Sequence, residues 1–66
     1  MFTILLSFVL LTGEVIPVAQ RKDSFPTMAA CEKVRAEDHA LFLRDLDKIK
    51  AAEPAVRDFK LECVKR

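Results

Sequence analysis

The chain opens with a segment whose apolar residues recur at every second position. Such alternation predicts a β-strand with one continuous apolar face. The other face of this strand is apolar as well, because it carries Leu5, Val9 and Leu11. The first face carries Phe2, Ile4, Leu6, Phe8 and Leu10.

A turn and a returning strand are predicted next. Thr12-Gly13 is the short connection that a β-hairpin needs, since glycine tolerates positive φ. Residues 15–19 are apolar and rich in β-branched side chains, so we expect a hairpin over residues 2–19. Pro17 has no backbone N–H, which predicts that the second strand lies at an edge of the sheet.

A helix is predicted over about residues 27–52. Thr27 is a suitable N-cap, whose hydroxyl can accept a hydrogen bond from a backbone N–H of the first turn. Pro54 ends the helix, because the residue before a proline avoids helical geometry. The polar stretch 35–39 interrupts the apolar stripe, so the helix is either continuous or bent there. The stripe comprises Met28, Cys31, Val34, Leu41 or Phe42, Leu46 and Ile49.

The last segment, residues 56–64, alternates apolar and polar side chains and predicts a third strand. We expect Phe59, Leu61 and Cys63 to point at the helix. A right-handed crossover through the helix places the first strand in the middle of the sheet. The sequence therefore predicts one α+β domain over residues 1–66 with element order ββαβ. Its three-stranded antiparallel sheet has the order 2-1-3, and one long helix packs on one face.

The length and charge of the chain argue against several classes of protein. With 66 residues it has little core, too little for an enzyme with its own cleft and cofactor pocket. Its 11 Lys and Arg residues against 10 Asp and Glu residues give a net charge of +1, which lacks the basic excess typical of nucleic-acid binding and leaves that function as a weaker alternative. The apolar share of 52% is typical of a folded chain and not of a disordered one.

No residue pattern indicates catalysis. Gly13 is the only glycine, which excludes a glycine-rich phosphate loop. Ser7 and Ser24 have no neighbouring base, and the only histidine, His39, lies in the most polar part of the predicted helix. We therefore expect a non-enzyme with no catalytic residue, no metal site, no cofactor and no small-molecule substrate.

Cys31 and Cys63 are the only cysteines, and both fall on faces that are expected to meet in the core. A bridge between them would close a loop of about 33 residues and stabilise the fold by about 3–4 kcal/mol. The alternative is a pair of buried thiols, as in many cytosolic proteins. With His39 they offer three zinc ligands, but the close spacings of zinc motifs are absent. The sequence leaves the disulfide and the free thiols open.

The apolar second face of the hairpin is the feature that points to a function. One helix covers only one face of a three-stranded sheet, and the other face normally carries polar residues. Several large aliphatic side chains remain there instead, and soluble monomers seldom expose such a patch. We expect this uncovered face to bind a protein partner or a second copy of the chain. Its expected residues are Leu5, Val9, Leu11, Val15 and Ile16.

The apolar start also raises the alternative of a signal peptide or a membrane anchor. No Lys or Arg precedes Arg21, and a cut after Ala19 would put Pro17 at the −3 position, which disfavours a signal peptide. The apolar run ends after about eleven residues, short of the roughly 18 that a membrane span requires. We expect a cytoplasmic protein of a bacterial host. The alternative is a periplasmic or membrane-associated protein, with residues 2–12 as signal or anchor and an oxidised cysteine pair.

Short motifs at the turn, at the start of the helix and near the C-terminus suggest a family. They are Leu10-Leu11-Thr12-Gly13-Glu14-Val15, Phe25-x-Thr27-Met28-Ala29-Ala30-Cys31-Glu32 and Cys63. In this combination the chain resembles a class of very short bacterial proteins, many of them encoded by prophages. That class has no assigned activity, so the resemblance implies an origin. Small phage-type proteins often bind and inhibit one host protein, including components of antiviral defence, and we expect this function by analogy.

Overall fold

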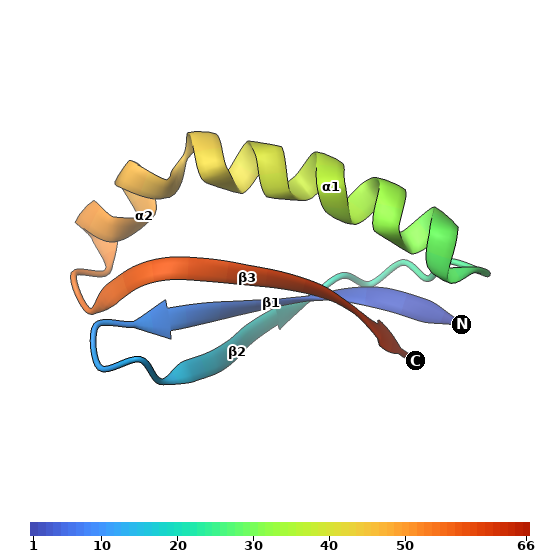
Figure 1. Ribbon diagram of the computed structural model, residues 1–66, viewed down its shortest axis with the longest axis horizontal. Helices are drawn as coiled ribbons and strands as arrows, with labels where there is room; N and C mark the ends of the chain where they lie inside the picture. Colours follow the sequence, from blue (N-terminus) through green and yellow to red (C-terminus); the bar gives the residue numbers. More distant parts are fainter.

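The N-terminal apolar segment forms the central strand of the sheet. The computed structural model describes residues 1–66, and in it β1 (Phe2–Leu10) pairs with both other strands (Figure 1). The partners are β2 (Val15–Gln20) and β3 (Val56–Lys65), and both pairings are antiparallel. The strand order is β2-β1-β3, so the predicted α+β class and sheet order are confirmed.

The hairpin turn has the backbone geometry that its glycine predicts. Gly13 has a φ of 91°, in the region that only glycine adopts without strain. The N–H of Gly13 donates to the Leu10 carbonyl at 2.9 Å, and the N–H of Leu10 donates to the Glu14 carbonyl at 2.8 Å. Beyond the turn, Pro17 lies in β2 at the edge of the sheet, as predicted.

The connection between β2 and β3 consists of two helices and not of the one long helix that the sequence predicts. They are α1 (Met28–Arg44) and α2 (Leu46–Ala52). As predicted, Thr27 caps α1, and its hydroxyl accepts from the Ala30 N–H at 3.1 Å. The break is at Asp45, whose φ of −97° and ψ of 8° lie outside the helical region.

The polar stretch 35–39 is not the site of the bend, because two of its side chains have partners across the fold. Asp38 pairs with Arg21, and the His39 ring lies 5.0 Å from the Phe59 ring of β3. The chain bends at Asp45, six residues after His39, which brings α2 back toward the sheet and packs Leu46 against the core.

The core lies between the helices and the central part of the sheet. Its buried members are Ile4, Cys31, Phe59 and Leu61. As predicted, the even-numbered apolar side chains of β1 and the alternating side chains of β3 face the helices. Partly buried residues complete this layer: Phe2, Leu6, Phe8, Phe25, Val34, Phe42, Leu46 and Cys63.

A polar network fastens the segment after β2 to the N-terminal part of β1 and to the C-terminus. The buried Thr3 hydroxyl lies 3.0 Å from the Arg21 carbonyl and 2.9 Å from the Asp23 carbonyl, to which it donates. The Arg66 guanidinium donates to the carbonyls of the same segment, with its shortest bond, 2.6 Å, to Lys22. These bonds satisfy polar groups that would otherwise destabilise a small core.

The helices cover the sheet unevenly. The backbone of α1 lies close to β3 and β1, that of α2 lies close to β3, and neither helix lies close to β2 (Figure 1). All six residues of β2 are exposed, whereas β1 and β3 each contain buried residues. The sheet therefore has one bare edge strand beside its helical layer.

Candidate protein-binding surface along β2

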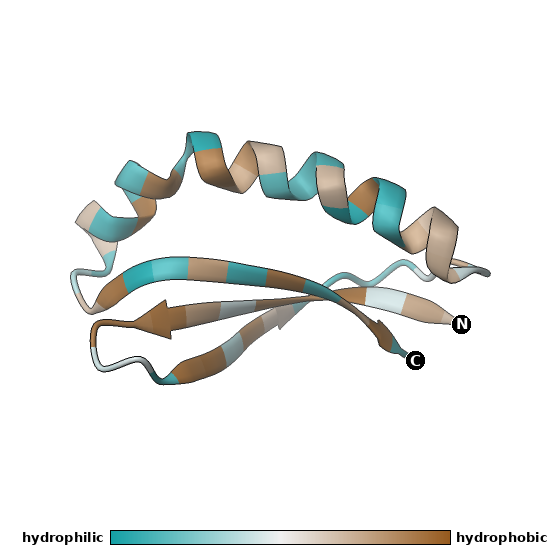
Figure 2. Cartoon of the chain, viewed as in Figure 1, coloured by the Kyte–Doolittle hydropathy of each residue, from teal (hydrophilic) through white to brown (hydrophobic).

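The exposed apolar side chains of the sheet gather on the hairpin. Gln20 is the only polar residue of β2. Figure 2 shows hydrophobic colours concentrated on β1 and β2, whereas the loop between them changes from brown to pale and teal, and α1, α2 and β3 alternate. The exposed fractions of the large apolar residues of the turn and β2 are 66% for Leu11, 50% for Val15, 37% for Ile16 and 46% for Val18.

The five residues that the sequence assigns to an interface do not lie on one face. Leu5 and Val9 are only partly exposed on the face away from the helices, and Val15 lies there because it pairs with Val9. Ile16 pairs with Phe8, which places it on the side of the helices. Leu11 is exposed in the turn.

The sheet face away from the helices is more polar than expected. Three residues of β1 on this face stand opposite charged residues of β3: Leu5 pairs with Glu62, Ser7 with Lys60 and Val9 with Asp58. The apolar part of this face is limited to its β2 side. The larger apolar surface lies around β2 itself and continues on the helical side.

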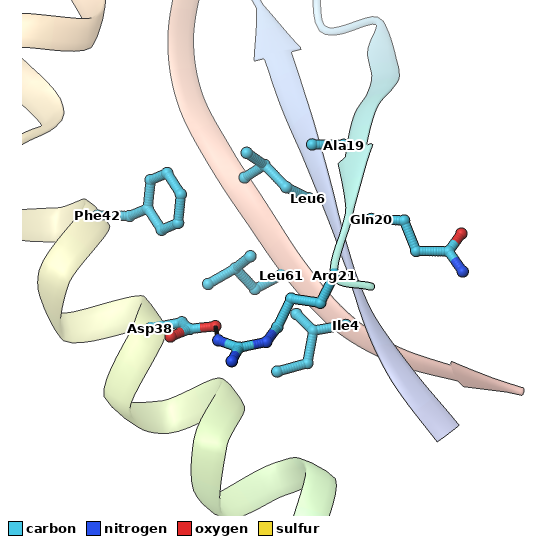
Figure 3. Close-up of a pocket in the computed structure, with 8 residues that line it drawn as sticks. All are labelled: Ile4, Leu6, Ala19, Gln20, Arg21, Asp38, Phe42 and Leu61. Carbon is cyan, nitrogen blue, oxygen red and sulfur yellow. Dashed lines mark hydrogen bonds and ion pairs between the residues drawn. The ribbon is translucent and has the colours of Figure 1, made fainter. Parts of the chain in front are cut away.

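Two shallow hollows on the helical side of the sheet follow β2. Their lining comes from all three strands of the sheet, from α1 and from the segment after α2. The first has a volume of about 160 Å³ and is lined by Ile4, Leu6, Ala19, Gln20, Arg21, Asp38, Phe42 and Leu61 (Figure 3). The second has a volume of about 260 Å³ and is lined by Phe8, Leu10, Ile16, Val18, Glu53, Ala55 and Val56. We call the two hollows together the β2 groove.

Arg21 closes one end of the β2 groove. Its side chain extends from the end of β2 to α1, where Nη1 lies 2.8 Å from Oδ2 of Asp38 (Figure 3). Nε and Nη2 also donate to the two carboxylate oxygens of Asp23, at 2.8 and 2.9 Å. The hydrogen bonds from Arg21 lower the pKa of Asp23, and those to Asp23 and Asp38 raise the pKa of Arg21.

The charge at the other end of the β2 groove is unpaired. Glu53 lines the second hollow and takes part in none of the ion pairs of the structure. The lining side chains of the groove carry no further ionisable group apart from Arg21 and Asp38. Both hollows are therefore lined mainly by apolar side chains, with an ion pair at the first and a free carboxylate at the second.

Cys31 and Cys63 form a disulfide, which is one of the two states that the sequence leaves open. Their Cα atoms lie 6.2 Å apart, and the bridge joins the first turns of α1 to β3. Cys31 is fully buried in the core cluster. The bridge lies under α1 and does not line the β2 groove.

The other residues considered for chemistry lie apart from each other. Ser7 is buried between its strand neighbours Pro17 and Lys60, and His39 stacks on Phe59. No three potential metal ligands gather at one place. What the structure assembles along β2 is a surface for apolar contact.

The sequence pattern identifies the excess of apolar residues but not the place where it collects. That place depends on how far the helical layer is displaced toward β3, which alternation along the strands does not reveal. The polar residues that alternate with Phe59, Leu61 and Cys63 in the last strand indicate that the far face is partly polar.

Comparison with protein-family models, with curated proteins and with solved structures gave no match. Neither helix combines the length and the apolar content that crossing a bilayer requires.

Proposed function

We propose that this protein is a non-catalytic protein-binding module that contacts its partner through β2 and the β2 groove. The observation that carries this proposal is that all six residues of β2 are exposed and are apolar up to Gln20. Burial of apolar area is the main source of affinity in most protein complexes. An exposed apolar patch of this kind also promotes aggregation unless a partner covers it.

The resemblance to small prophage-encoded proteins directs the search for this partner to proteins of a bacterial host. Binding to one such protein would inhibit it if the contact covered its active or assembly surface. A second copy of the chain is the other partner that the exposed surface allows.

The proposal is tested by affinity capture from a bacterial lysate with matched variants. Val18→Asp places a carboxylate on the proposed surface, and Leu43→Asp places one on α1, outside both hollows. Leu43 is 56% exposed and Val18 is 46% exposed, so the two changes are comparable in the free protein. We expect Val18→Asp to lose the protein that the wild type captures and Leu43→Asp to retain it. Equal capture by both variants would remove β2 as the contact surface.

The disulfide supports a second proposal, that the protein functions in an oxidising compartment. Disulfides persist in the periplasm and outside the cell, whereas the cytosol keeps thiols reduced. We propose this compartment in place of the cytoplasmic one expected from the sequence. A thiol titration of the protein, freshly released from cells into an alkylating agent, tests it: no reactive thiol is expected, and two would assign the protein to a reducing compartment.

A further inference from the structure

We infer that the β2 groove binds an amphipathic helix of a partner protein, whose apolar stripe lies on β2 and whose Lys or Arg side chain reaches Glu53. This inference rests on the proposed function and adds the chemistry of the partner. It follows from the space beside α1, from the irregular edge of β2 and from the charges at the two ends of the groove.

The part of the sheet that the helices do not cover has room for a second helix. Strands of a sheet lie about 4.8 Å apart, and packed helices lie about 8–10 Å apart. Because α1 lies over β3 and β1 and does not reach β2, a second helix over β2 would have α1 as its neighbour. Its floor would be apolar side chains of β1, which are partly buried, and of β2, which are exposed: Leu6, Phe8, Leu10, Ile16, Val18 and Ala19.

The edge of β2 is poorly suited to pairing with an added strand. An incoming strand would pair with the free backbone groups of β2, but Pro17 has no N–H to donate. The register of β2 also shifts between Ala19 and Pro17, so Val18 has no partner in β1. Prolines and bulges are the devices by which edge strands resist pairing. The side chains of β2 are available for contact, and its edge is poorly suited to a ladder.

The length of β2 and the charges at the two ends of the groove determine the length of the bound helix and the end that carries its basic residue. The Arg21–Asp38 ion pair bars the groove at the end of β2, and Glu53 marks its other end. Six strand residues span about 20 Å, which corresponds to about 13 residues of helix. The free carboxylate of Glu53 attracts a cation, so the basic residue belongs at this end of the helix.

The test uses two blocked peptides of about 14 residues, long enough to cover the strand. One carries leucine on one helical face and lysine on the other, and its counterpart carries glutamate in place of lysine. Fluorescence anisotropy measures the binding of each to the oxidised full-length protein. Because the whole chain has a net charge of +1, unspecific attraction would favour the glutamate peptide. A preference for the lysine peptide therefore reports the local charge of the groove.

We expect the lysine peptide to bind and the glutamate peptide to bind more weakly. Glu53→Gln should weaken the lysine peptide by about two- to fivefold, the effect of one exposed ion pair. Val18→Asp should weaken it by about tenfold or more, since a carboxylate would be buried against leucine. Leu43→Asp should leave it unchanged.

Three results would overturn the inference. They are equal affinity for the two peptides, undiminished binding to Val18→Asp, and a stable dimer in sedimentation that the lysine peptide does not dissociate. The last result would assign the groove to a second copy of the chain. If the peptides fail but Val18→Asp still loses its partner in capture, the protein-binding function stands and the helical partner does not.

Discussion

Reduction of the Cys31–Cys63 disulfide should strongly destabilise the fold. The bridge joins residues 32 apart in sequence and connects α1 to the edge strand β3. Reduction frees the unfolded chain from this constraint but leaves both sulfur atoms in the fold. The reduced Cys31 thiol would still have the Thr3 carbonyl oxygen as an acceptor, 3.6 Å from Sγ. The change therefore isolates the effect of the cross-link.

The magnitude follows from the length of the closed loop. For a loop of about 33 residues, the chain-entropy estimate gives about 3.5–4 kcal/mol at 25 °C. A domain of this size is stable by about 3–10 kcal/mol in total. Each kcal/mol corresponds to about 4–8 °C in the melting temperature of such a domain, so the expected drop is about 15–30 °C.

The assay is thermal unfolding followed by circular dichroism, with and without reductant, in parallel with a count of free thiols. The double variant Cys31→Ala with Cys63→Ala is the control, since its melting temperature should not respond to reductant. A reduced wild-type protein that melts within about 5 °C of the oxidised one would refute the reasoning. In that case the two cysteines would contribute as buried side chains alone.

Four substitutions test the packing and the polar network. Ile4→Ala should cost about 2–5 kcal/mol in urea unfolding, since Ile4 is fully buried; a loss under about 1 kcal/mol would contradict the core assignment. Gly13→Ala should cost about 1 kcal/mol because of its positive φ, and an unchanged unfolding midpoint would contradict this. Thr3→Val should cost about 1–2 kcal/mol, with Thr3→Ser recovering most of it if the hydroxyl bonds matter. The lowered pKa of Asp23 means that its ion pair stabilises the fold above the usual carboxyl pKa and is lost as pH falls through the lowered value. Below about pH 4 the wild type should therefore lose stability more steeply than Asp23→Asn, and parallel curves would show that the Arg21 pair contributes nothing.

Much of the fold could be predicted from the sequence because local signals agree with the global arrangement. Alternation in β1 and β3 identifies the residues that face the helices, and Gly13 and Thr27 mark the turn and the cap. Pro17 correctly identifies β2 as an edge strand. Each of these predictions depends on neighbours within a few positions along the chain.

The features that escaped prediction depend on packing between distant segments. The helix breaks at Asp45 because the chain must return to β3, and the polar stretch before it stays helical because Asp38 and His39 find partners across the fold. Likewise, the helical layer lies over β3 and β1, so the bare surface surrounds β2 and Ile16 turns to the helical side. Side-chain volumes and long-range ion pairs decide such displacements, and periodicity carries no information about them.

The central claim is that β2 and the groove beside it form the contact surface. Its most direct test is a titration of ¹⁵N-labelled oxidised protein with the lysine-bearing amphipathic peptide, followed by amide chemical shifts. We predict that the largest changes in amide chemical shift fall on residues 15–20 and on the groove residues Phe8, Phe42 and Glu53. Changes centred on Asp58, Lys60 and Glu62, which share the sheet face away from the helices, would contradict it, as would a spectrum that does not change.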